Sequence, residues 1–485
     1  MVPRLLPVLL AAALAAGANA YTLTPVNTSL AVGGGGDSGS TYAVAFKESA
    51  TLGLSYAFVS LMGYRYNDTT TIGAIAVYEC SGSYGLNAQC VFHSESTIFN
   101  PLFDPTDPAV DDNFGQAFVV DGNLVFVAAT AYPDDEWVGL VQVFDCSNPL
   151  ACVHVGTMTN PDPAYGYQFG NNLAALASNG ILVTTYAYSD YNLNETLAIV
   201  HNCSNVVLTG NCTIIKLLST IDYVRLGYYY NPEEIVYQFT YPYVIVGAPV
   251  SSKVYIWNIE SNDACVNTPK YGQVCDPVGT LARPDLSGFG VQTVYVSGLL
   301  FVASSKDGLV VYNCPNLAAC NASNVSGFVD APVDVDNYSI GSIDLVQVSS
   351  TELVLALGTP CQDDCTEGYV FFFSCDIGDV TAVACETPYN VTSGDTDFGL
   401  SVAFEKTIGY YGLIVTDSGE NLYLFSDTFA PPTSSSAPTQ STTSAPTTHA
   451  PSDPPSHSAA TSASMPATAA AILAAIVFAI STMVL

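Results

Sequence analysis

Aromatic and acidic residues gather at a few recurrent places in the chain, and these residue types suit recognition better than covalent chemistry. Examples are Tyr64-Arg65-Tyr66-Asn67-Asp68 and the segments 132–137 and 186–191. Exposed Tyr and Trp supply rigid contact area at recognition sites. The alternative is that some of the 30 tyrosines simply stand in ordinary loops. We predict that the ligand-binding residues are Tyr64, Tyr66, Tyr132, Asp134, Asp135, Trp137, Tyr165, Tyr167, Tyr188, Tyr191 and Tyr229.

Motifs for catalysis are incomplete. The glycine run 33–36 lacks the Gly-Lys-Ser/Thr that a phosphate loop needs, so it is interpreted as a flexible joint. Gly36-Asp37-Ser38-Gly39 looks like the nucleophile segment of chymotrypsin-like proteases, but no ordered His/Asp pair accompanies it. Neither tryptophan stands in a sialidase-type Ser-x-Asp-x-Gly-x-x-Trp box. We therefore predict no catalytic residue; a glycosidase- or lyase-type enzyme with carboxylates at a central channel remains an alternative.

Metal and cofactor sites are not predicted. The central region has only three histidines, His93, His154 and His201, and no zinc site is predicted from them. The sequence does not decide whether the acidic loops hold a metal.

The charge balance excludes whole classes of partner. The 485 residues include 43 Asp and Glu against 10 Lys and Arg, for a net charge of -33. No basic patch is available to neutralise nucleic-acid phosphates or to adsorb to anionic lipid. Charged residues are 11% of the chain, against about 25% in ordinary globular proteins. Because 42 of the acids and nine of the bases lie in residues 21–430, we predict one acidic folded domain with neutral or basic partners.

Both ends of the chain indicate export to the cell surface. Residues 1–20 have the charge, apolar run and small-residue site of a signal peptide. Residues 431–458 are rich in Ser, Thr and Pro and predict an extended stalk. Residues 459–485 fit a GPI-attachment signal that is removed, with attachment at Ser458 or, as a second candidate, at Ser462-Ala463-Ser464. A single transmembrane helix is the alternative for this tail.

Cysteines and sequons fit the same compartment. Fourteen cysteines in a secreted chain predict a disulfide framework. A local pairing at one recurrent turn accounts for twelve of them: Cys80 with Cys90, Cys146 with Cys152, Cys203 with Cys212, Cys265 with Cys275, Cys314 with Cys320, and Cys375 with Cys385. The remaining two, Cys361 and Cys365, pair with each other. N-glycosylation is predicted at Asn27, Asn67, Asn194, Asn202, Asn211, Asn321, Asn324, Asn337 and Asn390.

A repeat organises residues 21–430. Six units open with an apolar residue and a glycine, at Phe114-Gly115, Phe169-Gly170, Leu226-Gly227, Phe289-Gly290, Ile340-Gly341 and Phe398-Gly399. Each unit contains up to four predicted strands, A to D, with the cysteine pair at the C–D turn. The first unit lacks the opening step, and the last lacks its fourth strand. The opening steps are 51 to 63 residues apart, and short strands that repeat in units of roughly this length predict a propeller.

Closure of the ring follows from the incomplete last unit. The spare N-terminal strand, residues 21–30, is expected to supply its missing strand. The sequence thus predicts an all-β, seven-bladed β-propeller of four-stranded blades, closed without a covalent link. In such a ring the B–C and D–A loops share one face.

The repeat resembles FG-GAP repeats, which build the N-terminal propeller of integrin α subunits. The resemblance covers about residues 41–427 and is carried by Phe398-Gly399 and by Val246-Gly247-Ala248-Pro249 with the strand 253–257. It implies extracellular ligand binding or adhesion. Several family members carry an Asp-x-Asp-x-Asp-Gly calcium loop between strands A and B. The A–B turns here, such as Asp121-Gly122-Asn123, are too short to wrap calcium, so calcium binding is not carried over.

These observations together predict a GPI-anchored glycoprotein on the extracellular face of the plasma membrane. Its propeller is expected to bind a protein or glycan ligand in adhesion or recognition. Besides the enzyme named above, a purely structural surface coat is the other alternative.

Overall fold

A computed structural model describes most of the region between residues 24 and 427. The chain divides into two parts, Met1–Pro431 and Pro432–Leu485, and only the first contains described residues. The predicted signal peptide, stalk and GPI signal, with Ser458, lie outside the described residues. Those described are residues 24–31, 43–48, 54–67, 70–81, 89–103, 112–132, 138–161, 166–176, 180–185, 188–189, 198–218, 237–240, 242–262, 265–268, 272–330, 340–361, 365–386, 389–394, 396–405, 411–416 and 421–427.

The first three large sheets follow the first three repeat units. Neighbouring strands within each unit are antiparallel. The first sheet contains β2 (Val44–Glu48), β3 (Leu54–Asn67), β4 (Thr70–Ser81), β5 (Gln89–Phe92) and the short β6 (Ile98–Phe99). The second contains β7 (Phe114–Asp121), β8 (Leu124–Ala129), β9 (Leu140–Asp145) and β10 (Val153–Thr159). The third contains β12 (Leu173–Leu176), β13 (Ile181–Thr184), β15 (Ala198–Asn202) and β16 (Thr213–Leu218), extended by β21 (Gly272–Cys275) and β20 (Cys265–Thr268).

The later units form four more sheets. The fourth contains β17 (Tyr237–Thr240), β18 (Tyr243–Ala248), β19 (Lys253–Asn258) and β22 (Gly279–Ala282). The fifth contains β23 (Gln292–Val296), β24 (Leu299–Ser304), β25 (Gly308–Asn313) and β26 (Val325–Asp330). The sixth contains β27 (Ser342–Gln347), β28 (Glu352–Thr359), β29 (Tyr369–Asp376), β30 (Ala384–Cys385) and β31 (Tyr389–Val391). The last contains β32 (Ser401–Glu405), β33 (Tyr411–Thr416), β34 (Asn421–Asp427) and β1 (Thr24–Ala31).

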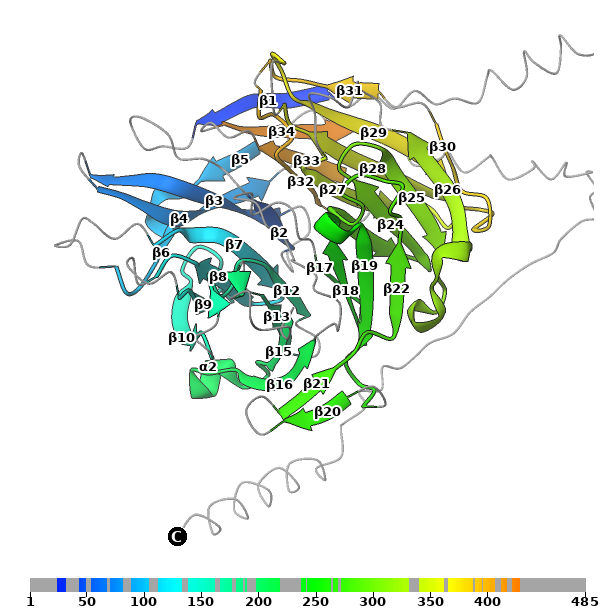
Figure 1. Ribbon diagram of the computed structural model, residues 1–485. Helices are drawn as coiled ribbons and strands as arrows, with labels where there is room; N and C mark the ends of the chain where they lie inside the picture. The colour runs from blue at the N-terminus through cyan, green and yellow to red at the C-terminus, as the bar shows by residue number, and fades with distance from the viewer. Residues whose placement is uncertain are drawn as a thin grey trace, which may run out of the picture. The chain divides into compact units, whose positions relative to one another are not determined.

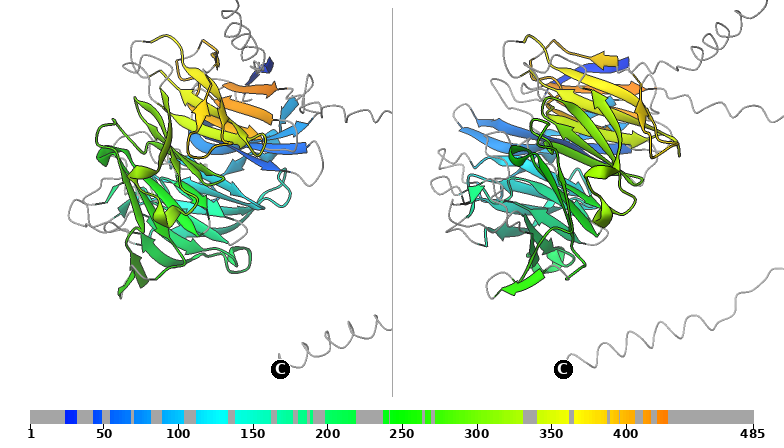
Figure 2. Two further views of the ribbon diagram at one scale, coloured as in Figure 1. Left: turned by 90° about the vertical axis from the view of Figure 1, so that its right-hand side faces the viewer. Right: turned by 45° about the vertical axis from the view of Figure 1, so that its right-hand side comes forward.

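The two ends of the domain meet in this last sheet. β1 pairs antiparallel with β34, with Thr24 opposite Ser426 and Ala31 opposite Asn421. Figures 1 and 2 show the blue first strand beside the orange last strands. The expected pairing of the N-terminal strand with the last unit is therefore present.

The innermost strands connect the sheets into a ring. β2 contacts β7, and the contacts continue through β12, β17, β23, β27 and β32, which in turn contacts β2. The fold is thus an all-β propeller, with sheets that follow one another in chain order (Figure 1). The number of blades stays a prediction.

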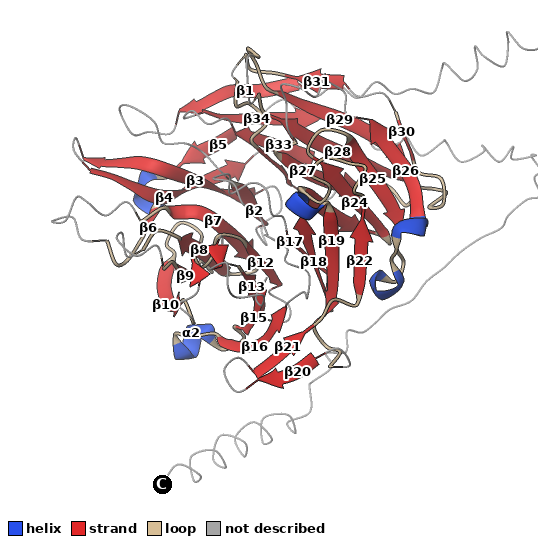
Figure 3. Cartoon of the chain, in the orientation of Figure 1, coloured by secondary structure: helices blue, strands red, loops and turns tan. Residues whose placement is uncertain are grey.

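Short helical turns occupy connections between strands (Figure 3). They are α2 (Val206–Thr209), η1 (Ser94–Ser96), η4 (Pro249–Ser251), η5 (Leu317–Ala319) and η6 (Ala322–Asn324). Within the described parts of the chain, no helix has the length and apolar character needed to cross a membrane.

The Phe-Gly step is a packing device at the seams between neighbouring units. The phenylalanines of the four literal steps, Phe114, Phe169, Phe289 and Phe398, are fully buried. The glycines that follow have φ between 88° and 98°, a backbone region that favours glycine. At Gly290 a Cβ would lie 2.6 Å from the carbonyl oxygen of Lys253 in the preceding unit. The repeated step therefore provides close backbone contact between units rather than a chemical group.

Side chains add hydrogen bonds across three of these seams. The hydroxyl of Ser60 donates to the carbonyl oxygen of Gly115 at 2.6 Å. The side-chain amide nitrogen of Gln292 donates to the carbonyl oxygen of Gly341 at 2.8 Å. The hydroxyl of Ser342 donates to the carbonyl oxygen of Gly399 at 3.1 Å. In each case the acceptor is the glycine that opens the next unit. These carbonyl groups thereby find partners in the interior, where an unpaired one would be costly.

The seven predicted disulfides are confirmed, and each spans four to ten residues of sequence. Six of them close the turn between the third and fourth strands of their units, as in the first unit, where Cys80 of β4 is bonded to Cys90 of β5. Seven disulfides indicate an extracellular or secreted protein. The bonds join Cys80 to Cys90, Cys146 to Cys152, Cys203 to Cys212, Cys265 to Cys275, Cys314 to Cys320, Cys361 to Cys365 and Cys375 to Cys385.

The first two of these cross-links differ in where they lie relative to the strands. Cys90 stands directly opposite Cys80 in the ladder between β4 and β5, and both side chains are buried in the core of the first sheet. Cys152 directly precedes β10, and Cys146 directly follows β9, so their bond closes the turn just outside the ladder. Cys152 packs against the core between the first two units. The same recurrent disulfide can therefore lie within the strand ladder, as in the first unit, or just beyond it, as in the second.

Two elements differ from the sequence prediction. β3 extends to Asn67, so Tyr64, Tyr66 and Asn67 lie in a long hairpin with β4 and not in a B–C loop. The hairpin of β20 and β21, tied by Cys265–Cys275, leaves its own unit: β21 pairs parallel with β16 of the third unit. Alternating apolar residues predict a strand but not the sheet that receives it.

Candidate functional site

The B–C and D–A loops meet on one face, as the propeller geometry predicts. β11 (Gly166–Tyr167), from the connection between units two and three, pairs antiparallel with β14 (Tyr188–Ser189), from the B–C loop of unit three. In this register Tyr167 stands directly opposite Tyr188. Two of the predicted ligand-binding residues are therefore brought together by the backbone, although they are 21 positions apart in sequence.

Two other predicted tyrosines are partly buried by the domain itself. The ring of Tyr64 lies 5.5 Å from that of Phe99, and Tyr64 packs against the core of the first sheet. Tyr132 packs against the core between the first two units, and its carbonyl accepts a 2.7 Å bond from the backbone N–H of Gly139. Contacts within the domain therefore bury part of the surface of both tyrosines. Their contact with a ligand stays a prediction.

Of the remaining predicted ligand-binding residues, one has a described backbone and the others are not described. Tyr66 belongs to β3, where the backbone is described. The others lie outside the described residues: Asp134, Asp135, Trp137, Tyr165, Tyr191 and Tyr229.

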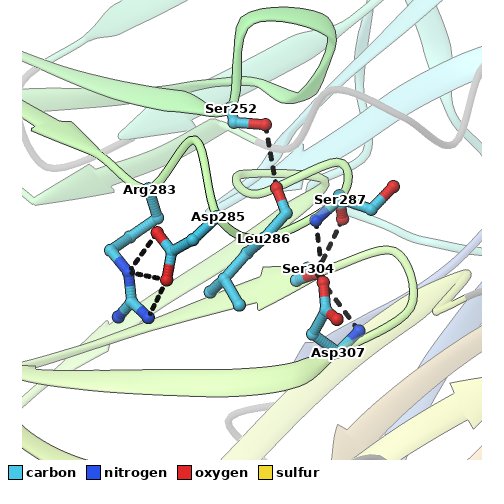
Figure 4. A network of polar contacts seen from close by, with 7 residues as sticks. All are labelled: Ser252, Arg283, Asp285, Leu286, Ser287, Ser304 and Asp307. Atoms are coloured by element: carbon cyan, nitrogen blue, oxygen red, sulfur yellow. Dashed lines mark hydrogen bonds and ion pairs between the residues drawn. The ribbon is translucent and has the colours of Figure 1, made fainter.

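A polar network that the sequence analysis missed fixes this face between units four and five (Figure 4). The carboxylate of Asp307, in the turn after β24, accepts bonds from the backbone N–H of Ser287 at 2.7 Å and the hydroxyl of Ser304 at 2.8 Å. The hydroxyl of Ser304 also approaches the carbonyl oxygen of Ser287 at 2.7 Å. The network joins the D–A connection of one unit to the B–C turn of the next, so it sets the relative position of two loops.

An ion pair lies beside this network. The Nε and Nη2 atoms of Arg283 donate to Asp285 at 3.0 and 2.8 Å. The paired guanidinium lowers the pKa of the Asp285 carboxyl, and the same bond raises the pKa of Arg283. Both charges are largely satisfied by each other, so this pair is suited to holding loop geometry and not to proton transfer. An exposed pair of this kind contributes little to stability.

A second carboxylate is held on the loop side of unit six. Glu367 accepts bonds from the hydroxyls of Tyr369 at 2.6 Å and Thr392 at 3.1 Å. It stands two residues after the Cys361–Cys365 disulfide, and the backbone N–H of Cys361 donates to Thr396 at 2.7 Å. The loop is thus closed covalently and anchored by polar contacts. Among the residues with assigned positions, no group of three or more His, Cys, Asp or Glu is arranged to hold a metal ion.

These polar residues carried only a weak sequence signal. Ser304 and Asp307 belong to a short turn before Gly308, and Ser and Asp are common in turns for local reasons. Their partners come from the preceding connection, about 20 residues away. The network depends on how the loops of two neighbouring units are aligned, which the local sequence does not indicate.

The predicted glycosylation sites favour the outer parts of the sheets. Asn202, Asn211, Asn321 and Asn390 are exposed beside third or fourth strands, and Asn324 is half-buried. Asn27 lies in β1 and Asn67 in β3, where only the backbone is described. Asn194 and Asn337 lie outside the described residues.

Comparison with known proteins yields structural likenesses alone. No protein-family model matches the chain, and no curated protein matches it. The computationally designed Ika8 protein aligns with 82% of this chain and 100% of its own, at 9% identity and a TM-score of 0.42. Sqt1 of Saccharomyces cerevisiae aligns with 82% of this chain and 99% of its own, at 10% identity and a TM-score of 0.44. Similarity at this level says nothing about function.

Proposed function

We propose that the protein is a GPI-anchored cell-surface glycoprotein whose propeller binds an extracellular protein or glycan through the face formed by its B–C and D–A loops. The observation that carries the proposal is the β11–β14 pairing, which sets Tyr167 opposite Tyr188 on that face. Rigid scaffolds commonly present binding residues on such loops.

Two further features support this assignment. Seven disulfides suit a protein that works outside the cell. The loops on the proposed face are fixed by the Asp307 network and by the Glu367 contacts. Preorganised loops lose less conformational entropy when a ligand binds. The net charge of -33 favours neutral or basic ligands.

The same proposal includes a ring of seven blades related to FG-GAP repeats. Its support is the cycle of contacts among β2, β7, β12, β17, β23, β27 and β32, together with four buried Phe-Gly steps. The competing count is six blades. An experimental map of the domain that resolves six blades would contradict the proposed count.

Binding is tested with arrays of glycans and extracellular proteins, probed with the full-length protein in detergent. For any ligand found, the double variant Y167A/Y188A should weaken binding by about tenfold or more, as for residues at the centre of an interface. Tyr243 begins β18 on the opposite side, where its hydroxyl donates to Asn316, so Y243A is the matched control. Equal losses in both variants would contradict the proposed face, and a protein that binds nothing on the arrays would favour a structural coat.

The anchor is tested separately with a GPI-cleaving phospholipase on intact cells that display the protein. We expect release into the medium. Retention of the protein, together with peptides from residues 459–485 in the mature chain, would establish a membrane-spanning tail instead.

A further inference from the structure

The turn closed by Cys203–Cys212 exposes apolar side chains at the outer edge of unit three. Its single helical turn, α2, is fixed from beneath by Val206, which is 1% exposed and packs in the core between units two and three. The next two residues point outward: Val207 is 50% exposed and Leu208 is 86% exposed. The turn is therefore well anchored and still presents a large aliphatic side chain to water.

A third exposed apolar residue stands at the start of β10, the strand of the neighbouring unit that α2 contacts. α2 contacts β10, and a Cβ on Gly156 of β10 would overlap the carbonyl oxygen of Gly210. Val153, at the start of β10, is 62% exposed. We call Val153, Val207 and Leu208 the rim patch. Single exposed apolar residues are ordinary, but a group of them marks a surface that something covers.

Two glycosylation sequons stand at the base of the same turn. Asn202 directly precedes Cys203, and Asn211 directly precedes Cys212, so the disulfide holds both asparagines beside α2. Both are exposed. The Oδ1 atom of Asn202 accepts a bond from the backbone N–H of Ser204 at 3.0 Å, which leaves its Nδ2 atom as the group available for attachment.

A second place on the outer edge has the same composition. Val325 and Phe328 of β26 are exposed, and two sequons adjoin them: Asn321 is the N-cap of the turn η6 and Asn324 is its last residue. Exposed apolar side chains and sequons thus occur together in two separate units.

We propose that N-linked glycans at Asn202 and Asn211 lie over the rim patch and shield it from water and from other proteins. In the attachment reaction, Nδ2 forms a bond to C1 of the sugar, the lipid-diphosphate carrier leaves with the electron pair, and Nδ2 loses one proton. The C–H faces of the first sugars then pack on Leu208 and Val207 while their hydroxyls remain in water. Glycans on both sides of α2 hinder access by a protein, which favours sugar as the occupant. The proposal rests on the secreted location given above.

Hydroxyl-radical footprinting with mass spectrometry tests this contact in the full-length chain expressed in glycosylating eukaryotic cells. We expect Leu208 to be oxidised several-fold faster in N202Q/N211Q than in the wild type. Val266, exposed in a hairpin that has no sequon, serves as the internal reference and should not change. N390Q, which removes a sequon from unit six, should leave Leu208 unchanged. A non-reducing peptide map must retain Cys203–Cys212 in each variant, so that faster oxidation cannot be assigned to an opened turn.

Each outcome decides a different statement. Equal oxidation of Leu208 with and without occupied sequons would overturn the shielding and leave the rim patch open to a protein partner. Unmodified Asn202 and Asn211, with glycans found elsewhere, would also overturn it while leaving the proposed function intact. Absence of glycans at all nine sequons would contradict the surface-glycoprotein assignment itself.

Discussion

Between units four and five, the seam and a cross-linked turn are stabilised by different physical means. At the seam, a Cβ on Gly247 would overlap the carbonyl oxygen of Gly290, and Phe289 is fully buried against Tyr312. At the turn between the third and fourth strands of unit five, Cys314 and Cys320 are joined covalently, and both side chains are buried in the core that units four and five share. The seam depends on backbone contact with no room for one more atom, whereas the turn depends on a cross-link that restricts the unfolded chain. We therefore expect a substitution at the glycine contact to affect the whole domain, whereas loss of the cross-link should first release its own turn.

The largest effect is expected at the seam, from Gly290→Ala. The new Cβ would meet Lys253, and φ of 98° strains any residue with a side chain. The free energy of unfolding should fall by about 2–4 kcal/mol. Denaturant unfolding measures this change. Gly394→Ala is the control, because its φ is 82° but nothing lies within 4 Å of its added Cβ, so only strain of about 1–2 kcal/mol applies. Equal losses in both variants would remove steric contact as the explanation.

The cross-link is removed by replacing both Cys314 and Cys320 with Ala. Loss of a short cross-linked loop should lower the free energy of unfolding by about 2–3 kcal/mol. Hydrogen exchange provides the comparison with the seam. The backbone N–H of Cys314 bonds to Gly298, and that of Gly290 bonds to Ala303; the first should lose protection and the second should keep it. Equal loss at both would show that the turn and the seam unfold together.

A buried histidine gives unit three a pH dependence. His201 is buried beside the Phe169 ring and within hydrogen-bond distance of the Thr184 hydroxyl, and burial lowers its pKa to about 3. Below pH 6.5 the unfolded chain binds a proton that the folded chain does not. This imbalance lowers stability by about 1.4 kcal/mol per pH unit, or about 2 kcal/mol at pH 5. Denaturant unfolding at pH 6.5 and pH 5 should show a smaller loss for His201→Gln than for the wild type. Identical losses would exclude His201 as the source.

The smallest effect has the opposite sign and belongs to the half-buried end of a strand. Desolvation raises the pKa of Asp121, at the end of β7, to about 6. A raised pKa means that ionisation disfavours the folded state as the pH rises from about 4 to 6. Because Asp121 is only half-buried, solvent screening limits the effect to about 1 kcal/mol. Asp121→Asn should therefore gain stability relative to the wild type between pH 4 and pH 7 in the same unfolding assay. A constant difference in unfolding free energy between the variant and the wild type across that range would contradict the raised pKa of Asp121.

The repeat made the fold largely predictable from sequence. The spacing of the cysteines predicted all seven disulfides, because each pair closes a short local loop, as between Cys80 and Cys90 or between Cys146 and Cys152. The incomplete last unit predicted the pairing of β1 with β34. The disulfides follow from local spacing in the sequence. The β1–β34 pairing follows because an unpaired sheet edge requires a partner strand.

Contacts between units were not predictable in the same way. The destination of β21 depends on which neighbouring edge lies nearest, and the Asp307 network depends on the register of two loops. For the candidate site, the sequence indicated that Tyr167 and Tyr188 share a face but not that they stand opposite each other. It also placed Tyr64 in a loop, although the residue continues β3 and packs on Phe99. Abundant tyrosine is compatible with both core packing and recognition, so residue type alone does not separate the two roles.

The order of strands in the last sheet determines how the domain bears mechanical load. In the proposed function a stalk follows β34, and tension on residues beyond Asp427 would enter the propeller through that strand. β34 lies between β33 and β1, and two ladders of hydrogen bonds share the load. One of the two partners is the first described strand of the chain, which is joined to this sheet without a covalent bond. A pull on the residues beyond Asp427 would therefore be resisted first where β1 and β34, at the two ends of the domain, pair with each other.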